Sequence, residues 1–205
     1  MGKLFAAVLG WAIALGVCVG LWGCANTVAP EAITLAIEPN QDWTTVQYGG
    51  LQLDIPPNFV AGQPGLELKA LQASLVAAGF ENRTGWLAQN AEEIALLAFE
   101  ATGDQLTAIN VIQVGRSPDE TLENYVAKQV TQLEAAGITV ELLAIETDTS
   151  VGALKLQTEN QEQLIYVYPG AEEFWVVTYS GEHGQLAATT IERSRRSVEI
   201  LTEAE

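Results

Sequence analysis

The chain has 205 residues, of which 9 are basic and 26 acidic, and its formal net charge is −17 at pH 7. This balance argues against a nucleic-acid partner, because nucleic-acid binding relies on clustered Lys and Arg against phosphate. An anionic membrane surface would repel the same charge, so a membrane attachment has to come from a lipid or an apolar helix.

Residues 1–23 have the layout of a secretory signal peptide. Lys3 gives a positive start, and no charged residue occurs from Leu4 to Ala25. The run closes with Leu21-Trp22-Gly23-Cys24, which resembles the lipobox of bacterial lipoproteins. The resemblance implies cleavage before Cys24 and acylation of Cys24, for example with palmitate. The predicted localisation is extracytoplasmic, anchored by this lipid to the cell membrane or the outer membrane.

Two alternatives to the lipid anchor stay open. The apolar run is about 20 residues long, enough for an uncleaved transmembrane helix. The other alternative is an ordinary cleaved signal peptide, although its apolar core is typically about 7–15 residues long and the run here is longer. Cys18 lies in the removed segment, so a lipidated Cys24 leaves no cysteine for a disulfide, a zinc site or a thiol nucleophile.

Residues 24–42 are predicted to form a flexible tether, in which 32–37 could add a short edge strand. Residues 43–205 then suffice for one globular domain with a sizeable core. The domain opens with a hairpin of strands 43–48 and 51–55, which are joined at Gly49-Gly50 and stopped by Pro56-Pro57.

A helix and then two strands are predicted after this hairpin. Apolar residues at helical spacing predict a helix over 66–78, with Gly79 as its C-terminal cap. Two strands are predicted next, over 93–101 and 106–114, joined at Gly103-Asp104.

A capping box predicts the start of the next helix. Ser117 is expected at the N-cap, Pro118 at the first helical position and Glu120 at the third, and Gly137 ends the helix. Leu122, Tyr125, Val126, Val130 and Leu133 would line its apolar face. Four strands are predicted over 138–146, 151–158, 163–168 and 174–179. The last helix is predicted over 185–201.

Runs of strands bracketed by helices predict an α+β fold, with a mainly antiparallel sheet flanked by helices in an α-β-α sandwich. The chain resembles the PsbP-like fold of the extrinsic photosystem protein, the Mog proteins and DcrB-type bacterial lipoproteins. The resemblance rests on the hairpin ending at 53–59, the strand 108–114, the helix start at 123–125, Gly152 and the strand 173–179. Members are generally non-catalytic binding or assembly factors, and the resemblance carries over no catalytic residue.

Few residues suggest a specific site. Trp86, in a glycine-containing connection, is a possible partner contact, because tryptophan is enriched at interface hot spots. The one basic concentration is Arg193-Ser194-Arg195-Arg196, in which Arg193 and Arg196 share a helix face and are possible contacts for an anionic head group or an acidic partner. Ser180, Glu182 and His183 invite a hydrolase reading, but no strained G-x-S-x-G turn holds the serine.

No cofactor is predicted, and a divalent-cation site assembled across strands remains open. Carboxylates cluster without the spacing of a calcium loop, at Glu92-Glu93, Asp119-Glu120-Glu123, Glu141, Glu146, Asp148 and Glu172-Glu173. The sequence therefore favours a membrane-anchored, non-enzymatic binding or assembly module acting through contacts with an unknown protein partner. The alternative is an envelope protein that binds a small ligand or divalent metal in transport, and a hydrolase is the third reading.

Overall fold

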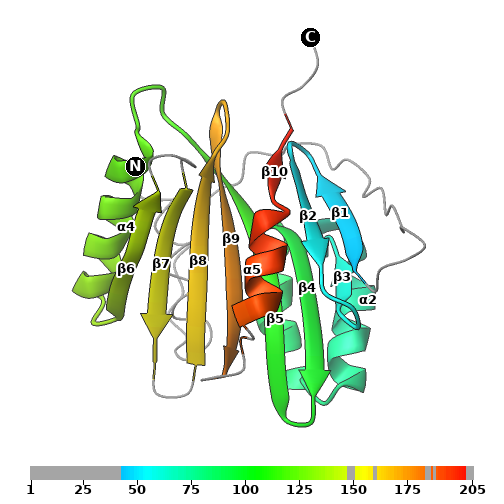
Figure 1. The fold of residues 1–205 in the computed structure, drawn as a ribbon. Helices are drawn as coiled ribbons and strands as arrows, with labels where there is room; N and C mark the ends of the chain where they lie inside the picture. The colour runs from blue at the N-terminus through cyan, green and yellow to red at the C-terminus, as the bar shows by residue number, and fades with distance from the viewer. Residues whose placement is uncertain (1–42, 147–150, 159–160, 183–185, 187, 202–205) are drawn as a thin grey trace.

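The computed structural model describes residues 43–146, 151–158, 161–182, 186 and 188–201. A seven-stranded sheet of order β3-β4-β5-β9-β8-β7-β6 forms its centre, and every neighbouring pair is antiparallel (Figure 1). The strands span Val60–Gly62 (β3), Ile94–Thr102 (β4), Gln105–Gly115 (β5), Thr139–Glu146 (β6), Val151–Gln157 (β7), Gln161–Pro169 (β8) and Glu173–Glu182 (β9).

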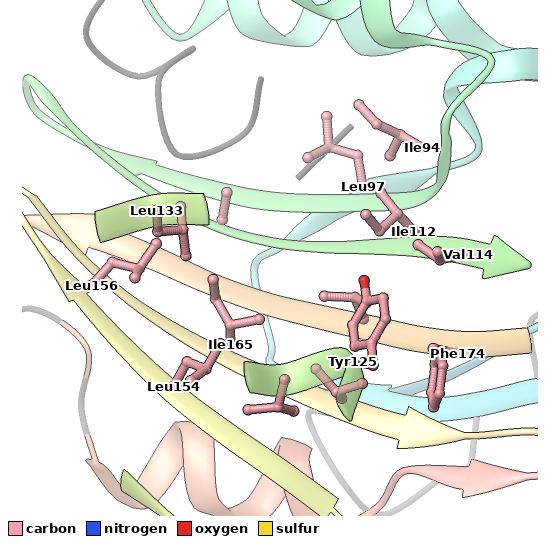
Figure 2. Packing of buried hydrophobic residues seen from close by; sticks show 14 of the residues in the cluster. Ile94, Leu97, Ile112, Val114, Tyr125, Leu133, Leu154, Leu156, Ile165 and Phe174 are labelled. Atoms are coloured by element: carbon pink, nitrogen blue, oxygen red, sulfur yellow. The ribbon is translucent and has the colours of Figure 1, made fainter. Parts of the chain in front are cut away.

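One face of this sheet is covered by helices. They are α2 (Pro64–Ala77), the 3₁₀ turn η1 (Glu81–Arg83), α3 (Thr84–Asn90) and α4 (Leu122–Ala135). In Figure 1, α2 lies behind β3 and β4, and α4 lies near β6 at the opposite end of the sheet. Tyr125 of α4 stacks on Phe174 of β9 with ring centroids 4.5 Å apart (Figure 2).

The other face carries a second, smaller sheet and one helix. The sheet has the order β1-β2-β10, from Thr44–Tyr48, Leu51–Ile55 and Glu199–Ile200, and the helix is α5 (Ala188–Arg196). Each face of the large sheet has its own hydrophobic core, and successive side chains of β9 point alternately into one and the other. Phe174 and Val176 pack with the helix side, whereas Trp175 and Val177 pack with the small sheet.

The predicted fold class is confirmed. The structure is α+β with antiparallel sheets, and its central strands are buried on both faces. The hairpin at Gly49-Gly50 and the six predicted strands from 93 to 179 occur, with their ends shifted by at most three residues. The helix predicted over 66–78 begins two residues earlier, at Pro64.

The predicted capping box is wrong. Ser117 and Glu120 form a turn in which the amide of Glu120 donates to the carbonyl of Ser117 at 2.9 Å. The helix starts at Leu122, and Thr121 is its N-cap, whose hydroxyl accepts from the amide of Asn124 at 3.2 Å. Both segments offer a hydroxyl at a helix start, so the local motif alone does not decide between them.

The predicted last helix is too long. It ends at Arg196, and the hydroxyl of Ser197 donates back to the carbonyl of Ser194 at 2.7 Å. The same hydroxyl accepts from the amide of Asp54, and residues 199–200 then pair with β2 as β10. Three further elements, β3, the 3₁₀ turn η1 and α3, were not predicted.

Candidate binding pocket

A pocket of about 90 Å³ opens on the helix side of the sheet. It lies where the β4–β5 turn meets the end of β9 and the start of β8. Figure 1 shows these strand ends together at the bottom of the sheet. Its apolar lining comes from α2 and the turn after it, from α3, and from β4 and β5, and consists of Leu75, Phe80, Trp86, Leu97, Phe99, Leu106 and Ala108. Segments more than 100 residues apart in sequence therefore build one concave surface.

The end of α2 positions the first wall of the pocket. Gly79 takes a φ of +87°, which suits glycine, and its amide donates to the carbonyl of Val76 at 3.0 Å. The amide of Phe80 donates to the carbonyl of Leu75 at 2.8 Å, which completes a Schellman motif. This reversal brings both Leu75 and Phe80 to the pocket.

Trp86 lies in the second wall. It is on α3 rather than in an irregular connection, because Gly85 is tolerated in the first turn of that helix. The side-chain amide of Asn90 donates to the carbonyl of Trp86 at 2.7 Å, and that of Gln72 in α2 donates to the carbonyl of Thr84 at 3.0 Å. The indole is partly buried against the helix-side core. A residue predicted as a partner contact therefore lines the pocket.

Arg83 brings a positive charge to the same wall. Its Nε is buried, and within the described part of the chain it has no hydrogen-bond partner. Burial lowers the pKa of the guanidinium below its usual value, although an arginine remains protonated at neutral pH. A half-buried cation of this kind is poorly solvated, so an incoming anionic group would stabilise it.

Negative charge lines the pocket where the strands end. Asp104 lies in the β4–β5 turn, directly after Gly103 with its φ of +66°, and Glu182 ends β9. One carboxylate oxygen of Glu182 accepts from Nε2 of Gln105 at 3.0 Å. Among the described ion pairs none joins Arg83 to either carboxylate. The pocket thus holds separate groups of opposite charge.

The structure places part of the suspected hydrolase group in this pocket. Ser180 is buried on β9, and its hydroxyl donates to the carbonyl of Ala108 at 3.5 Å, a long hydrogen bond. Glu182 also lines the pocket, whereas His183 lies outside the described residues. In the described structure the serine hydroxyl therefore points toward a backbone carbonyl.

Arg193 and Arg196 lie in the last turn of α5, on the opposite face of the sheet from the pocket. The guanidinium of Arg193 lies 4.3 Å from the centroid of the Trp43 ring. Arg196 pairs with Glu192 at 2.5 Å, and Arg195 makes two hydrogen bonds of 3.0 Å with the same carboxylate. The basic concentration is therefore engaged largely with its own domain.

Some of the predicted features lie outside the residues that the structure describes. Cys24, the tether 24–42 with its possible strand, and Asp148 lie outside the described residues. In the part of the chain that is described, no three His, Cys, Asp or Glu side chains gather closely enough to hold a metal ion. The helices within that part include none long and apolar enough to cross a bilayer.

The sequence singled out Trp86 as a possible partner contact, but not Arg83 or Asp104, which also line the pocket. Arg83 stands three residues before Trp86, and it is one of few basic residues in an acidic chain. That proximity was a usable signal. Asp104 lies in a predicted hairpin turn, and only the tertiary fold brings it to the same pocket as Arg83.

Comparison with known proteins yields one kind of match. The chain matches no family model and no curated protein. Among solved structures it is similar to the solution structure of cyanobacterial PsbP (CyanoP) from Synechocystis sp. PCC 6803, with a TM-score of 0.46 and 10% sequence identity. The match covers 87% of this chain and 98% of that chain. No site residue is carried over from that protein.

Proposed function

We propose that this chain is a membrane-anchored, extracytoplasmic binding module that holds a small ligand in the pocket and does not turn it over. The observation that carries the proposal is the pocket itself, which combines an apolar lining with the half-buried cation of Arg83. Small-molecule sites are typically concave and apolar, with a few charged groups that fix orientation.

Binding is favoured over turnover by the chemistry of the lining. A serine nucleophile needs a base within hydrogen-bond reach and donors that stabilise the developing oxyanion. The Ser180 hydroxyl is directed at the Ala108 carbonyl instead, and a guanidinium is too weak a base for the role at neutral pH. The geometry of the pocket thus supports holding a ligand.

Attachment to the membrane through Cys24 completes the proposal. The support is the lipobox-like sequence together with the charge of residues 24–205. Those residues contain every acidic residue of the chain and all basic residues except Lys3. Such a domain gains nothing from an anionic membrane surface, so a covalent lipid or an apolar helix would have to hold it there, and the lipobox-like sequence favours the lipid.

A cysteine substitution tests the anchor. We expect Cys24→Ala to give an unacylated precursor that keeps residues 1–23, whereas the wild-type chain incorporates a labelled fatty acid and loses those residues. Intact-mass spectrometry and metabolic labelling measure both outcomes. If Cys24→Ala is still cut and tethered to the membrane, the lipid anchor on Cys24 is wrong.

A pocket-filling substitution tests the binding site. Ala108 lines the pocket, whereas Ala127 is exposed on α4 and serves as the matched control. The full-length chain is titrated with 3-methylbutan-1-ol, an uncharged branched probe, and tryptophan fluorescence is followed. We expect a saturable change in wild type and Ala127→Leu, and its loss in Ala108→Leu and in Trp86→Phe. The same response in Ala108→Leu as in wild type would place binding elsewhere.

A further inference from the structure

We infer that the pocket takes a free aliphatic amino acid as its zwitterion, with the carboxylate at Arg83, the ammonium group at Asp104 and Glu182, and the side chain on the apolar lining. This inference rests on the proposed function, because it assigns the ligand class of the same pocket. Three independent properties of the pocket carry it: its volume, its cation and its carboxylates.

The volume favours an aliphatic side chain over an aromatic one. An engineered apolar cavity of about 150 Å³ holds a benzene ring. The pocket here has about 90 Å³, which suits a group with the bulk of a leucine or valine side chain. The rings of Phe80, Trp86 and Phe99 already supply the aromatic surface of the lining.

The guanidinium group of Arg83 favours a planar anion such as a carboxylate. A guanidinium has five N–H donors in a planar fork, one of them on Nε, and it can bind a carboxylate with two parallel hydrogen bonds. In Arg83 that Nε is buried without a partner in the described structure. Because that atom is closed to solvent, an arriving carboxylate would pair with the other guanidinium nitrogens and neutralise the charge of Arg83.

The carboxylates exclude a ligand that is only anionic. Asp104 and Glu182 line the same small pocket, and like charges close together are repulsive. A cationic group on the ligand would turn that repulsion into attraction. Because Arg83 forms no described ion pair with either side chain, both charges stay available to a ligand. A zwitterion with an apolar side chain satisfies all three features together.

The test compares three probes that share one branched carbon skeleton. L-leucine carries both charges, 4-methylpentanoate lacks the amino group, and 3-methylbutan-1-amine lacks the carboxylate. Each is titrated into the full-length wild-type chain by calorimetry at neutral pH. We expect leucine to bind at least about tenfold more tightly than either single-charge analogue, which corresponds to about 1.4 kcal/mol. L-phenylalanine is expected to bind more weakly than leucine.

Charge-removing variants locate the two ends of the ligand. Arg83→Gln should remove the advantage of leucine over the amine, and Asp104→Asn should reduce its advantage over the acid. Glu81→Gln is the matched control, because Glu81 is exposed on the same 3₁₀ turn and does not line the pocket. Circular dichroism verifies folding, and the three-probe comparison on the wild-type chain does not depend on any variant.

The outcomes separate this inference from the proposed function. Equal affinity for leucine and for the two analogues, with binding still lost in Ala108→Leu, overturns the zwitterion and keeps the pocket as a binding site. Tighter binding of 4-methylpentanoate than of leucine overturns the role of the carboxylates. Failure of all these probes and of 3-methylbutan-1-ol overturns both proposals.

Discussion

The hydroxyl of Tyr179 donates a 3.0 Å hydrogen bond to Oγ of Ser194, and Ser194 in turn donates to the carbonyl of Asp54 at 2.7 Å. These three residues come from β9, α5 and β2, so two bonds tie the central sheet to the layer that covers it. Tyr179 and Ser194 are both buried. Burial raises the pKa of Tyr179 above its ordinary value, which keeps the phenol protonated as a donor.

Removing the middle of this chain of hydrogen bonds is expected to be costly. Ser194→Ala leaves a buried phenol without its acceptor, so we expect the free energy of unfolding to fall by about 1–3 kcal/mol. Tyr179→Phe removes the hydroxyl itself, so no buried phenol is left without a partner, and the free energy of unfolding should fall by only about 0.5–1.5 kcal/mol. Urea denaturation of both variants and of the double variant measures the coupling. Strictly additive losses would mean that the two hydroxyls do not interact.

The start of α4 gives a test with a built-in control. Thr121→Ala removes the N-cap oxygen that accepts from Asn124, so we expect a loss of about 1 kcal/mol. Ser117→Ala changes an exposed hydroxyl in the preceding turn and should stay within about 0.5 kcal/mol of wild type. Thermal unfolding compares the two variants. The reverse order would restore the capping box at Ser117 and contradict the structure.

The contact between α4 and β7 depends on a missing side chain. A Cβ added at Gly152 would lie 2.7 Å from Cγ2 of Val126 and 3.5 Å from Cδ1 of Leu122. We expect Gly152→Ala to destabilise the fold by about 1–3 kcal/mol through overpacking. Combining it with Val126→Ala should cost less than the sum of the two single changes, because the second change removes the clash. Additive losses in chemical denaturation would show that the helix does not pack at this glycine.

The arginines of α5 predict a pH dependence. Hydrogen bonds from Arg195 and Arg196 lower the pKa of Glu192 in the folded chain. A lowered folded-state pKa stabilises the fold above the unfolded pKa, about 4.3, and this contribution disappears as the pH falls through the folded value. We expect Glu192→Gln to cost about 0.2–1 kcal/mol at pH 7, as for other exposed pairs, and almost nothing at pH 3. Stability curves of both proteins from pH 3 to 7 measure this. A difference that grows toward acid pH would contradict it.

Local patterns in the sequence predict most of the fold. Alternation in 163–168 and the β-prone apolar run at 174–179 indicate strands that the structure places side by side as β8 and β9. The end of α5 was misjudged because Ser197 caps the helix through a hydroxyl that also accepts from Asp54, 143 residues away in sequence. Because a residue of a distant strand helps to fix the end of this helix, the sequence around residue 197 is not enough to predict where the helix ends.

The pocket was predictable only through Trp86. Its lining joins residues from Leu75 to Glu182, and their proximity depends on the antiparallel order of β4, β5, β9 and β8. Arg83 has no sequence feature that shows its Nε to be buried without a partner in the described structure. Burial of that atom depends on how η1 packs within the fold, which the amino-acid pattern does not specify.

The most direct test of the central claim is a crystal structure of the full-length chain soaked with L-leucine. We predict density for the ligand between Trp86 and the strand ends, with its carboxylate within hydrogen-bond distance of Arg83 and its ammonium group near Asp104 or Glu182. An empty pocket at a leucine concentration that saturates binding in solution, or density on another surface of the domain, would contradict it.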